Sequence, residues 1–278
     1  MSLLLGFFTG LVLGLTGAGG SVLAVPLLMW GLGWSLPQAT PVALLAVCAA
    51  AAFGTAVAWD VSYIRYRAAV LMAAASLLTA PLGLWLAQRL PHDSLVALFA
   101  ALLVGVALRN WRQAQRAPQE AAIVRAAVAG DGSPAAGPIC RLDRRTGRLI
   151  WTWPCRSLIG ATGAATGFLS GLLGVGGGFV IVPSLRAWSE LSVHSAIATS
   201  LMAIALVSAI TVLMSLAQGH ALPWQIAAPF VTGALGGMLA GRRLAPRIAG
   251  PRLQQGFAAL MIVVAFGMAA QAFHVFQG

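Results

Sequence analysis

Charged residues are scarce in this chain. Only 8% of its 278 residues are charged, whereas soluble domains carry about 25%. Hydrophobic residues make up 59% of the sequence, and the mean hydropathy is +0.88. Because such a composition cannot cover a surface that faces water, the sequence predicts an integral membrane protein and excludes a soluble domain.

Lysine is missing altogether. All 17 basic residues are arginines, and with six acidic residues they give a net charge of +11. A basic balance can mark a nucleic-acid-binding protein, but such a protein needs a basic face on a recognisable binding module, which this sequence lacks. The arginines cluster instead at the ends of apolar segments, as membrane orientation requires. We therefore expect no nucleic-acid partner.

Residue groups that carry catalysis or bind metals are also missing. No carboxylate lies deep in an apolar segment, no Cys/His/Asp group has metal-binding spacing, and no nucleophile–base pair stands out. The dinucleotide pattern G-x-G-x-x-G is incomplete, because Val22 and Phe179 occupy its last position. The sequence thus predicts no enzyme, cofactor or metal. Because the central loop is expected to be cytoplasmic, we also expect no structural disulfide among Cys48, Cys140 and Cys155.

Two glycine-rich stretches recur along the chain. The first is "LTGAGGSVLAVP" at 15–26 and the second is "LLGVGGGFVIVP" at 172–183, 157 residues later. Further matches at a slightly shorter offset pair Gly83, Arg89 and Leu90 with Gly237, Arg243 and Leu244. Because the first stretch recurs in mid-chain and lacks a basic n-region, we expect it to belong to the fold and not to a signal peptide.

The repeat predicts two homologous halves, 1–110 and 157–278, joined by a polar linker at 111–156. Each half contains four apolar blocks, at 2–33, 38–58, 67–88 and 93–109, then at 157–189, 195–218, 223–241 and 253–274. A membrane-spanning helix needs about 20 residues, so the first block of each half is too long for one span. The predicted fold class is an all-α polytopic membrane protein.

The arginines also predict an orientation. Nine of them lie between Arg109 and Arg156, so the linker should be cytoplasmic, as should the arginine-rich loops near Arg65 and Arg247. These placements agree only if the first block of each half is a hairpin that returns to the side it entered. Each half then has a glycine-tipped hairpin plus three spans, and the second half is inverted, an arrangement found in transporters.

The hairpin tips are the predicted substrate site. An arm of about 14 residues is roughly 21 Å long, which passes the middle of a ~30 Å hydrocarbon core. The helix that follows each tip points its N-terminus, with a partial charge of about +0.5, at the tip, where it can bind an anion. The residues expected there are Gly17, Gly19, Gly20, Ser21, Gly174, Gly176, Gly177 and Gly178.

Glycines in these blocks also admit a structural interpretation, because they allow helices to pack closely. Gly10, Gly14, Gly167 and Gly171, which precede the tips, fit that role. We also assign to the anion site the polar side chains near the start of the second apolar block of each half: Gln38, Thr40, Thr199 and Ser200. The alternative for the hydroxyls is a hydrogen bond to a carbonyl of their own helix.

The motifs themselves resemble a known family. "GLTGAGGSVLAVP" and "SGLLGVGGGFVIVPSL", the latter followed by "ATSLMAI", are similar to the paired signatures of the TauE/SafE sulfite exporter family, the TSUP transporters. The resemblance covers nearly the whole chain. It implies an inner-membrane permease for small sulfur-containing anions such as sulfite, thiosulfate or organosulfonates. The first half departs from "ATSL" at 41–44, which makes the two halves of the site chemically unequal.

The combined expectation is a secondary transporter that works by alternating access at a midplane anion site. An anion channel with the same tips and a non-transporting membrane scaffold or assembly factor remain as alternatives. The expected partners are a small anionic substrate and the lipid bilayer. A proton or a sodium ion is a candidate coupling ion, and a homodimer is a candidate assembly.

Overall fold

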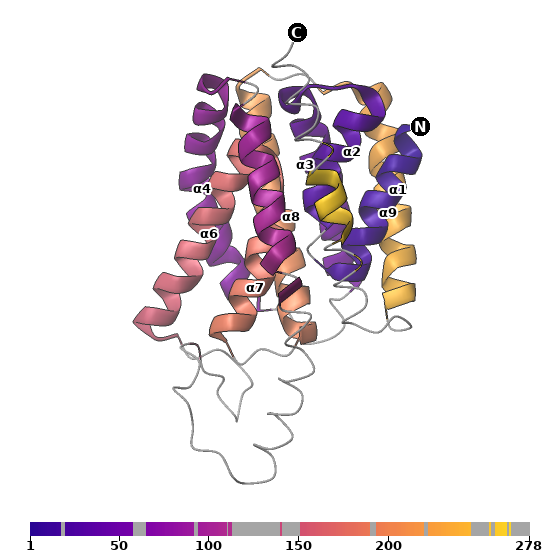
Figure 1. Ribbon diagram of the computed structural model, residues 1–278. Coiled ribbons are helices and arrows are strands. Elements are labelled where there is room, and N and C mark those ends of the chain that lie inside the picture. The colour runs from indigo at the N-terminus through magenta and orange to yellow at the C-terminus, as the bar shows by residue number, and fades with distance from the viewer. Residues whose placement is uncertain are drawn as a thin grey trace.

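The structure is a computed structural model in which the chain forms a bundle of helices (Figure 1). Residues 1–17, 20–57, 65–91, 94–109, 111–112, 140, 151–189, 193–219, 222–245, 256, 259–265 and 267 are described. The helices are α1 (Ser2–Thr16), α2 (Gly20–Leu32), α3 (Leu36–Val57), α4 (Tyr66–Arg89), an unlabelled helix (Ser94–Arg109), α6 (Trp153–Leu173), α7 (Gly178–Trp188), α8 (Val193–Ala217) and α9 (Trp224–Leu244). A short helical stretch at 259–265 follows. Every helix or strand in the described part of the chain is a helix, which confirms the all-α part of the predicted class.

The surface of the bundle is apolar, as a lipid-facing surface must be. Of the described helices, α3, α4 and α8 are long and apolar enough to cross a membrane. Along α4, Leu78 is 76% exposed, which would be unfavourable in water. Large aromatic residues are exposed at helix starts, namely Tyr66, Trp153 and Trp224, where an interfacial belt is expected. The protein is therefore a multi-pass membrane protein.

Both glycine-rich stretches interrupt a helix. α1 ends before Gly17 and α6 ends before Gly174, and these two glycines have φ angles of 75° and 72°. Each donates its N–H to a carbonyl four residues back, on Leu13 or Ser170. The helices that follow, α2 with 13 residues and α7 with 11, are about 20 and 16 Å long, too short for a ~30 Å core. The predicted breaks are confirmed.

The base of the second hairpin is tied together by a residue from the linker range. Cys140 forms a disulfide with Cys155 in the first turn of α6, with the two Cα atoms 5.1 Å apart. The N–H of Cys140 also donates to the Trp188 carbonyl, at the end of α7, over 2.9 Å. α7 therefore returns to the end at which α6 begins. The expectation of no disulfide is wrong for this structure, because the fold brings Cys140 across the open end of the hairpin.

The bundle has two ends that side-chain contacts identify. At the first, which we call the arginine end, the Arg65 N–H donates to Thr199 Oγ1 and the Arg242 guanidinium donates to the Gly54 carbonyl. At the second, the glutamine end, Gln88 Nε2 donates to Gln218 Oε1 over 2.8 Å. α6 runs parallel to α4, since Gly163 packs on Met72 and Gly171 on Ala80, so it begins at the arginine end. It begins at Trp153, inside the range predicted to be linker, so this arm is longer than expected.

Helix pairs between the two predicted halves pack through glycines. A Cβ on Gly10 of α1 would lie 1.9 Å from the Ala234 carbonyl oxygen of α9, and a Cβ on Gly167 of α6 would lie 2.5 Å from Ser76 of α4. The pairs α1–α9 and α4–α6 are thus held by backbone-to-backbone contact. Gly14 and Gly171 make equivalent close contacts, which confirms the packing interpretation of these four glycines.

The packing also corrects one sequence match. Gly83 packs on the Phe168 carbonyl, and Gly241 packs on the Leu11 carbonyl. Leu11 precedes Phe168 by 157 residues, so the two contacts are equivalent. Gly83 therefore corresponds to Gly241, whereas the sequence match pairs it with Gly237. Gly237 and Gly241 are four residues apart, which is about one helical turn, so both lie on nearly the same face of α9. The sequence pattern therefore cannot distinguish them.

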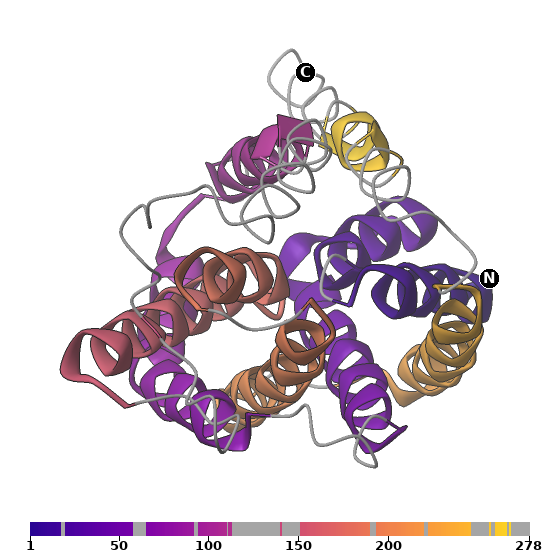
Figure 2. The same cartoon turned by 90° about the horizontal axis from the view of Figure 1, so that it is seen from below.

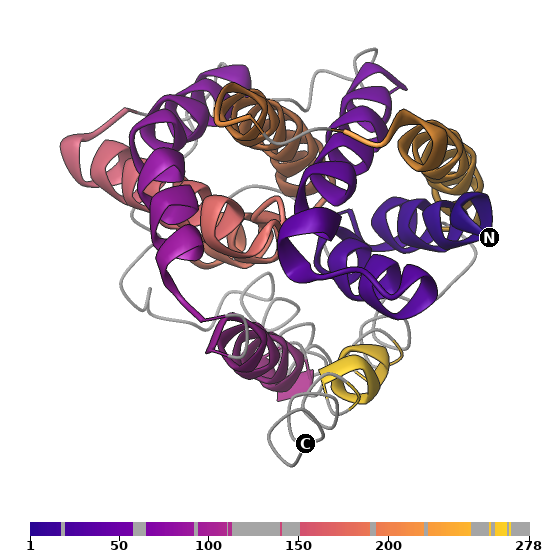
Figure 3. The same cartoon turned by 90° about the horizontal axis from the view of Figure 1, so that it is seen from above.

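The centre of the bundle lies where α3 and α8 cross. Cys48 Sγ donates to the Ala205 carbonyl over 3.4 Å, and these residues are 157 positions apart. The end-on views show Ser94–Arg109 and the 259–265 stretch together at one edge, outside the other helices (Figures 2 and 3). The α3–α8 crossing, flanked by both hairpins, is therefore where a site between the halves would lie.

Candidate functional site

The second tip is a run of glycines in left-handed conformation. Gly174, Gly176 and Gly177 have φ angles of 72°, 65° and 68°, which glycine adopts without steric penalty. The run lets the chain reverse between α6 and α7, and α7 then begins at Gly178. The N–H groups of Val180 and Ile181 are directed to the Gly177 carbonyl, at 3.1 and 3.4 Å. The positive end of α7 therefore faces the turn.

The first tip has related geometry. Gly17 has a φ angle of 75°, and Gly20 and Ser21 form the start of α2. A Cβ on Gly20 would lie 2.2 Å from the Leu13 backbone nitrogen, so glycine permits the close crossing of α1 and α2. Gly19 lies outside the described residues.

The structure brings the two tips into contact. A Cβ on Gly176 would lie 3.6 Å from Ser21 Cβ, 3.1 Å from Val47 Cγ1 and 2.9 Å from Ser208 Oγ. Ser21 and Ser208 are fully buried. The start of α2, the tip of the second hairpin and the crossing helices α3 and α8 therefore meet at one point, which we call the tip junction: Ser21, Val47, Gly176 and Ser208.

Each tip is covered by a residue of a crossing helix. Thr40 of α3 lies against Gly174, with its Cγ2 2.5 Å from the place that a Cβ on this glycine would take. Ile197 of α8 lies against Gly17 in the same way, at 2.4 Å. Thr40 and Ile197 are 157 positions apart, as are Gly174 and Gly17, so they hold equivalent places in the predicted repeat. One tip therefore has a hydroxyl beside it where the other has a hydrocarbon side chain.

The other polar residues assigned to the site have structural partners. Ser200 Oγ donates to the Ile197 carbonyl over 2.8 Å, and Thr40 Oγ1 donates to the Leu36 carbonyl at the same distance. Gln38 is exposed, and its Oε1 accepts the Ser35 N–H. These contacts favour the local, structural interpretation for Ser200 and Gln38, whereas Thr40 remains beside a tip.

Thr199 joins two helices. Its Oγ1 accepts the Arg65 N–H over 3.0 Å, which satisfies a backbone donor at the start of α4. We expect Thr199→Val to lower the free energy of unfolding by about 1–3 kcal/mol, because that partly buried N–H loses its partner. Anion affinity should not change. Thermal unfolding of the purified protein checks this.

The matched control for that variant is Thr55→Val. The Thr55 hydroxyl bonds only the Ala51 carbonyl of its own helix among the described contacts, so its loss should cost less. If Thr199→Val melted like the wild type and lost anion binding instead, Thr199 would be a ligand.

Sequence reasoning missed Ser208. Its Oγ is buried and has no hydrogen-bond partner within the described part of the chain, which is unusual for a hydroxyl. The serine stands in the apolar run "ALVSAIT" at 205–211, and nothing in the letters separates it from other buried serines. Its contact with Gly176 depends on the tertiary fold and appears only there.

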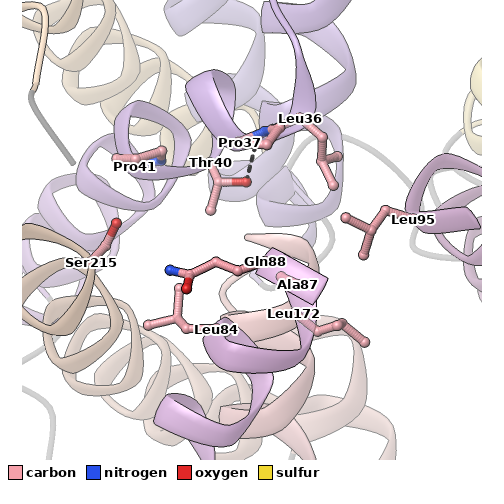
Figure 4. A pocket seen from close by; sticks show the side chains of 11 residues that line it. Leu36, Pro37, Thr40, Pro41, Leu84, Ala87, Gln88, Leu95, Leu172 and Ser215 are labelled. Atoms are coloured by element: carbon pink, nitrogen blue, oxygen red, sulfur yellow. Dashed lines mark hydrogen bonds between the residues drawn. The ribbon is translucent and has the colours of Figure 1, made fainter. Parts of the chain in front are cut away.

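A pocket leads from the glutamine end toward the second tip (Figure 4). Its empty volume is about 440 Å³, and Thr40, Gln88 and Ser215 contribute its polar side chains. Gly171 and Leu172, just before the tip, line it as well. Since Thr40 also touches Gly174, the pocket ends beside the second tip.

The electrostatics of the junction come from the backbone. Among the described arginine side chains, Arg67, Arg89, Arg109, Arg112, Arg156 and Arg243 are exposed, and none lines the pocket at the glutamine end. Arg65 Nε is buried and has no hydrogen-bond partner in the described residues, but it lies at the start of α4. Arg242 is half-buried, and its guanidinium donates to the Gly54 carbonyl at the arginine end. The positive groups that begin at the tips themselves are the N-termini of α2 and α7.

Comparison with known proteins is consistent with this architecture. The family described as "Sulfite exporter TauE/SafE" matches residues 2–268. Two proteins of Xylella fastidiosa, from strains 9a5c and Temecula1, are each described as "Probable membrane transporter protein" and are 29% and 30% identical over 264 residues. These matches cover 94% of this chain and 90% of each relative. No solved structure matches the chain.

Proposed function

We propose that this chain, which belongs to the TauE/SafE sulfite exporter family, is a secondary transporter of small sulfur-containing anions such as sulfite, thiosulfate or organosulfonates in the inner membrane. The observation that carries the proposal is the contact of the two helix breaks at the tip junction, with Gly176 against Ser21. Broken helices that meet between two halves are how many transporters build a substrate site. The family itself comprises membrane transporters, as the names of the relatives indicate.

An inverted relationship between the halves supports alternating access. α1 packs on α9 while α6, its counterpart in the repeat, packs on α4, so the halves exchange equivalent contacts. In Figure 1 the N-terminus lies in the upper half of the view and α6 starts at the lower end. Hairpins that enter from opposite ends can open the junction to one side at a time. The pocket at the glutamine end fits such a one-sided opening.

The helix ends fit an anion and a coupling cation. α2 and α7 begin at the tips with positive partial charge, whereas α1 and α6 end there with negative partial charge. Positive helix ends suit the oxyanion, and the carbonyls at the ends of α1 and α6 suit sodium or a proton carrier. The site therefore needs no buried arginine or lysine.

The proposed orientation places the arginine end in the cytoplasm. We expect cysteine at Arg243, an exposed position near that end, to react with a membrane-impermeant maleimide only after cells are permeabilised. Cysteine at the exposed Gln218 should react in intact cells. Labelling of both positions from the same side would contradict the orientation, and the unsubstituted chain serves as the background control.

The same orientation affects the cysteine pair. Thiols in the cytosol are kept reduced, so Cys140 and Cys155 should be a pair of thiols in the cell and form their disulfide on oxidation. A disulfide that persists in freshly lysed, alkylated cells would instead place this end on the oxidising side of the membrane.

Flux measurements test the transporter function. The purified protein in proteoliposomes should take up radiolabelled sulfite or thiosulfate with a rate that saturates, and unlabelled anion inside should accelerate uptake by exchange. Flux that rises without saturation and ignores the internal anion would identify a channel. No flux of any sulfur anion would leave a scaffold or assembly factor as the function.

A further inference from the structure

We infer that the two tips are unequal and that the chain holds one anion site, at the second tip, in which the Ser208 hydroxyl binds a small sulfur oxyanion. This inference rests on the proposed function. The inference adds to that function the position of the anion site, on one side of the junction, and the residue that selects the ligand.

The first support is the state of Ser208. Its side chain is fully buried, and its Oγ has no hydrogen-bond partner among the described residues. A buried hydroxyl without a partner is costly, so such a group in a native protein calls for a ligand or another explanation. The hydroxyl is aimed at the second tip, since it would lie 2.9 Å from a Cβ on Gly176.

The second support is what surrounds this hydroxyl. α7, a helix of 11 residues, begins two residues after Gly176, and its first N–H groups belong to Gly178 and Phe179. Ser21, at the start of α2, reaches the same tip. The Ser208 hydroxyl and the α7 N-terminus thus converge, and both stabilise negative charge.

The first tip lacks the corresponding groups. At the offset of 157, Ala51 holds the place of Ser208, Ile197 that of Thr40, and Gly178 that of Ser21. Ile197 is seen to lie against Gly17, so the equivalence holds in the structure for that pair. The first tip therefore offers hydrocarbon where the second offers hydroxyls, and we assign no anion to it.

The chemistry of the second tip defines the ligand class. The groups at hand are hydroxyl and backbone N–H donors, and Val47 packs 3.1 Å from the Gly176 Cβ position. Donors of this kind match a compact ion with several acceptor oxygens on one sulfur. In this conformation the second tip packs directly against Ser208, so the tip must withdraw before the anion can bind. Thr40, which lines the pocket at the glutamine end and contacts Gly174, lies between that pocket and the junction.

Calorimetry on the purified protein tests the inference with sulfite under nitrogen, thiosulfate and sulfate as probes. We expect one anion per chain. Ser208→Ala should weaken binding by about 10- to 150-fold, the effect of one hydrogen bond to a charged group. Ser76→Ala is the matched control, because that buried hydroxyl in α4 already bonds the Ala73 carbonyl of its own helix, and this variant should bind like the wild type.

Thermal unfolding without anion separates a ligand role from a structural one. Because Ser208 Oγ has no partner to lose, Ser208→Ala should melt at the wild-type temperature or above it. Unchanged affinity in Ser208→Ala, or two anions per chain, would overturn the inference while leaving the transport function standing. Failure of the wild type to bind any of the three anions would overturn both.

Discussion

Gly176→Ala should reduce anion affinity and transport at least about 100-fold. At a φ angle of 65° an alanine is strained by about 1–2 kcal/mol, and its Cβ would lie 2.9 Å from Ser208 Oγ. The tip must shift, and the shift removes at least two donors from the anion, each worth about 1.5–3 kcal/mol. Uptake into proteoliposomes and calorimetric affinity measure the loss.

Gly219→Ala is the control for backbone strain. Gly219 has a φ angle of 86° and open space where a Cβ would stand, and it lies after α8, at the glutamine end. The control variant should lose similar stability but transport like the wild type. Equal activity of the two variants would show that the second tip only reverses the chain.

Gly10→Ala and Gly167→Ala should prevent assembly of the bundle. The added Cβ of Gly10→Ala would lie 1.9 Å from a backbone oxygen of α9, and that of Gly167→Ala 2.5 Å from backbone of α4. Backbone cannot rotate away as a side chain can, so the helices must separate. We expect a loss of about 3 kcal/mol or more in each case. The yield of monodisperse protein and its melting temperature report this.

Gly160→Ala is the control for the packing variants. Gly160 lies in α6, seven residues before Gly167, and nothing stands within 4 Å of its Cβ position. Because alanine favours a helix over glycine by up to about 1 kcal/mol, this variant should be as stable as the wild type or more so. A stable, monodisperse Gly167→Ala protein would mean that α4 and α6 do not pack as closely as described.

Several features were predictable because they follow from local chemistry. The helix breaks at Gly17 and Gly174 follow from glycine-rich runs in apolar blocks too long for one span. The packing role of Gly10 and Gly167 follows from their four-residue spacing to Gly14 and Gly171. Residue spacing and block length are enough to predict the helix breaks and the packing glycines, without any knowledge of tertiary contacts.

Other features depend on contacts between distant segments. Thr199 and Ser208 are both buried hydroxyls in α8, yet one meets the Arg65 N–H and the other meets no described partner. Their sequence surroundings do not distinguish these states. The pairing of Cys140 with Cys155 likewise depends on how the hairpin base closes, which neither spacing nor a motif reveals.

The sequence predicted the asymmetry of the site only in part. The sequence showed that the first half lacks "ATSL" and so indicated unequal halves. It pointed, however, to Thr199 and Ser200, whereas the tip itself contacts Ser208, a further two helical turns along α8. Repeat symmetry locates equivalent positions, and the fold then shows which of them face the tips.

Crystals grown with selenite, the selenium analogue of sulfite, test the central claim most directly. Diffraction recorded at the selenium absorption edge should show one strong anomalous peak per chain at the second tip, within hydrogen-bonding reach of Ser208 Oγ and the first N–H groups of α7. A peak beside Arg65, whose buried Nε lacks a described partner, would replace the helix-end site with an arginine site. Peaks at both tips, or none in the bundle, would equally contradict a single anion site at the second tip.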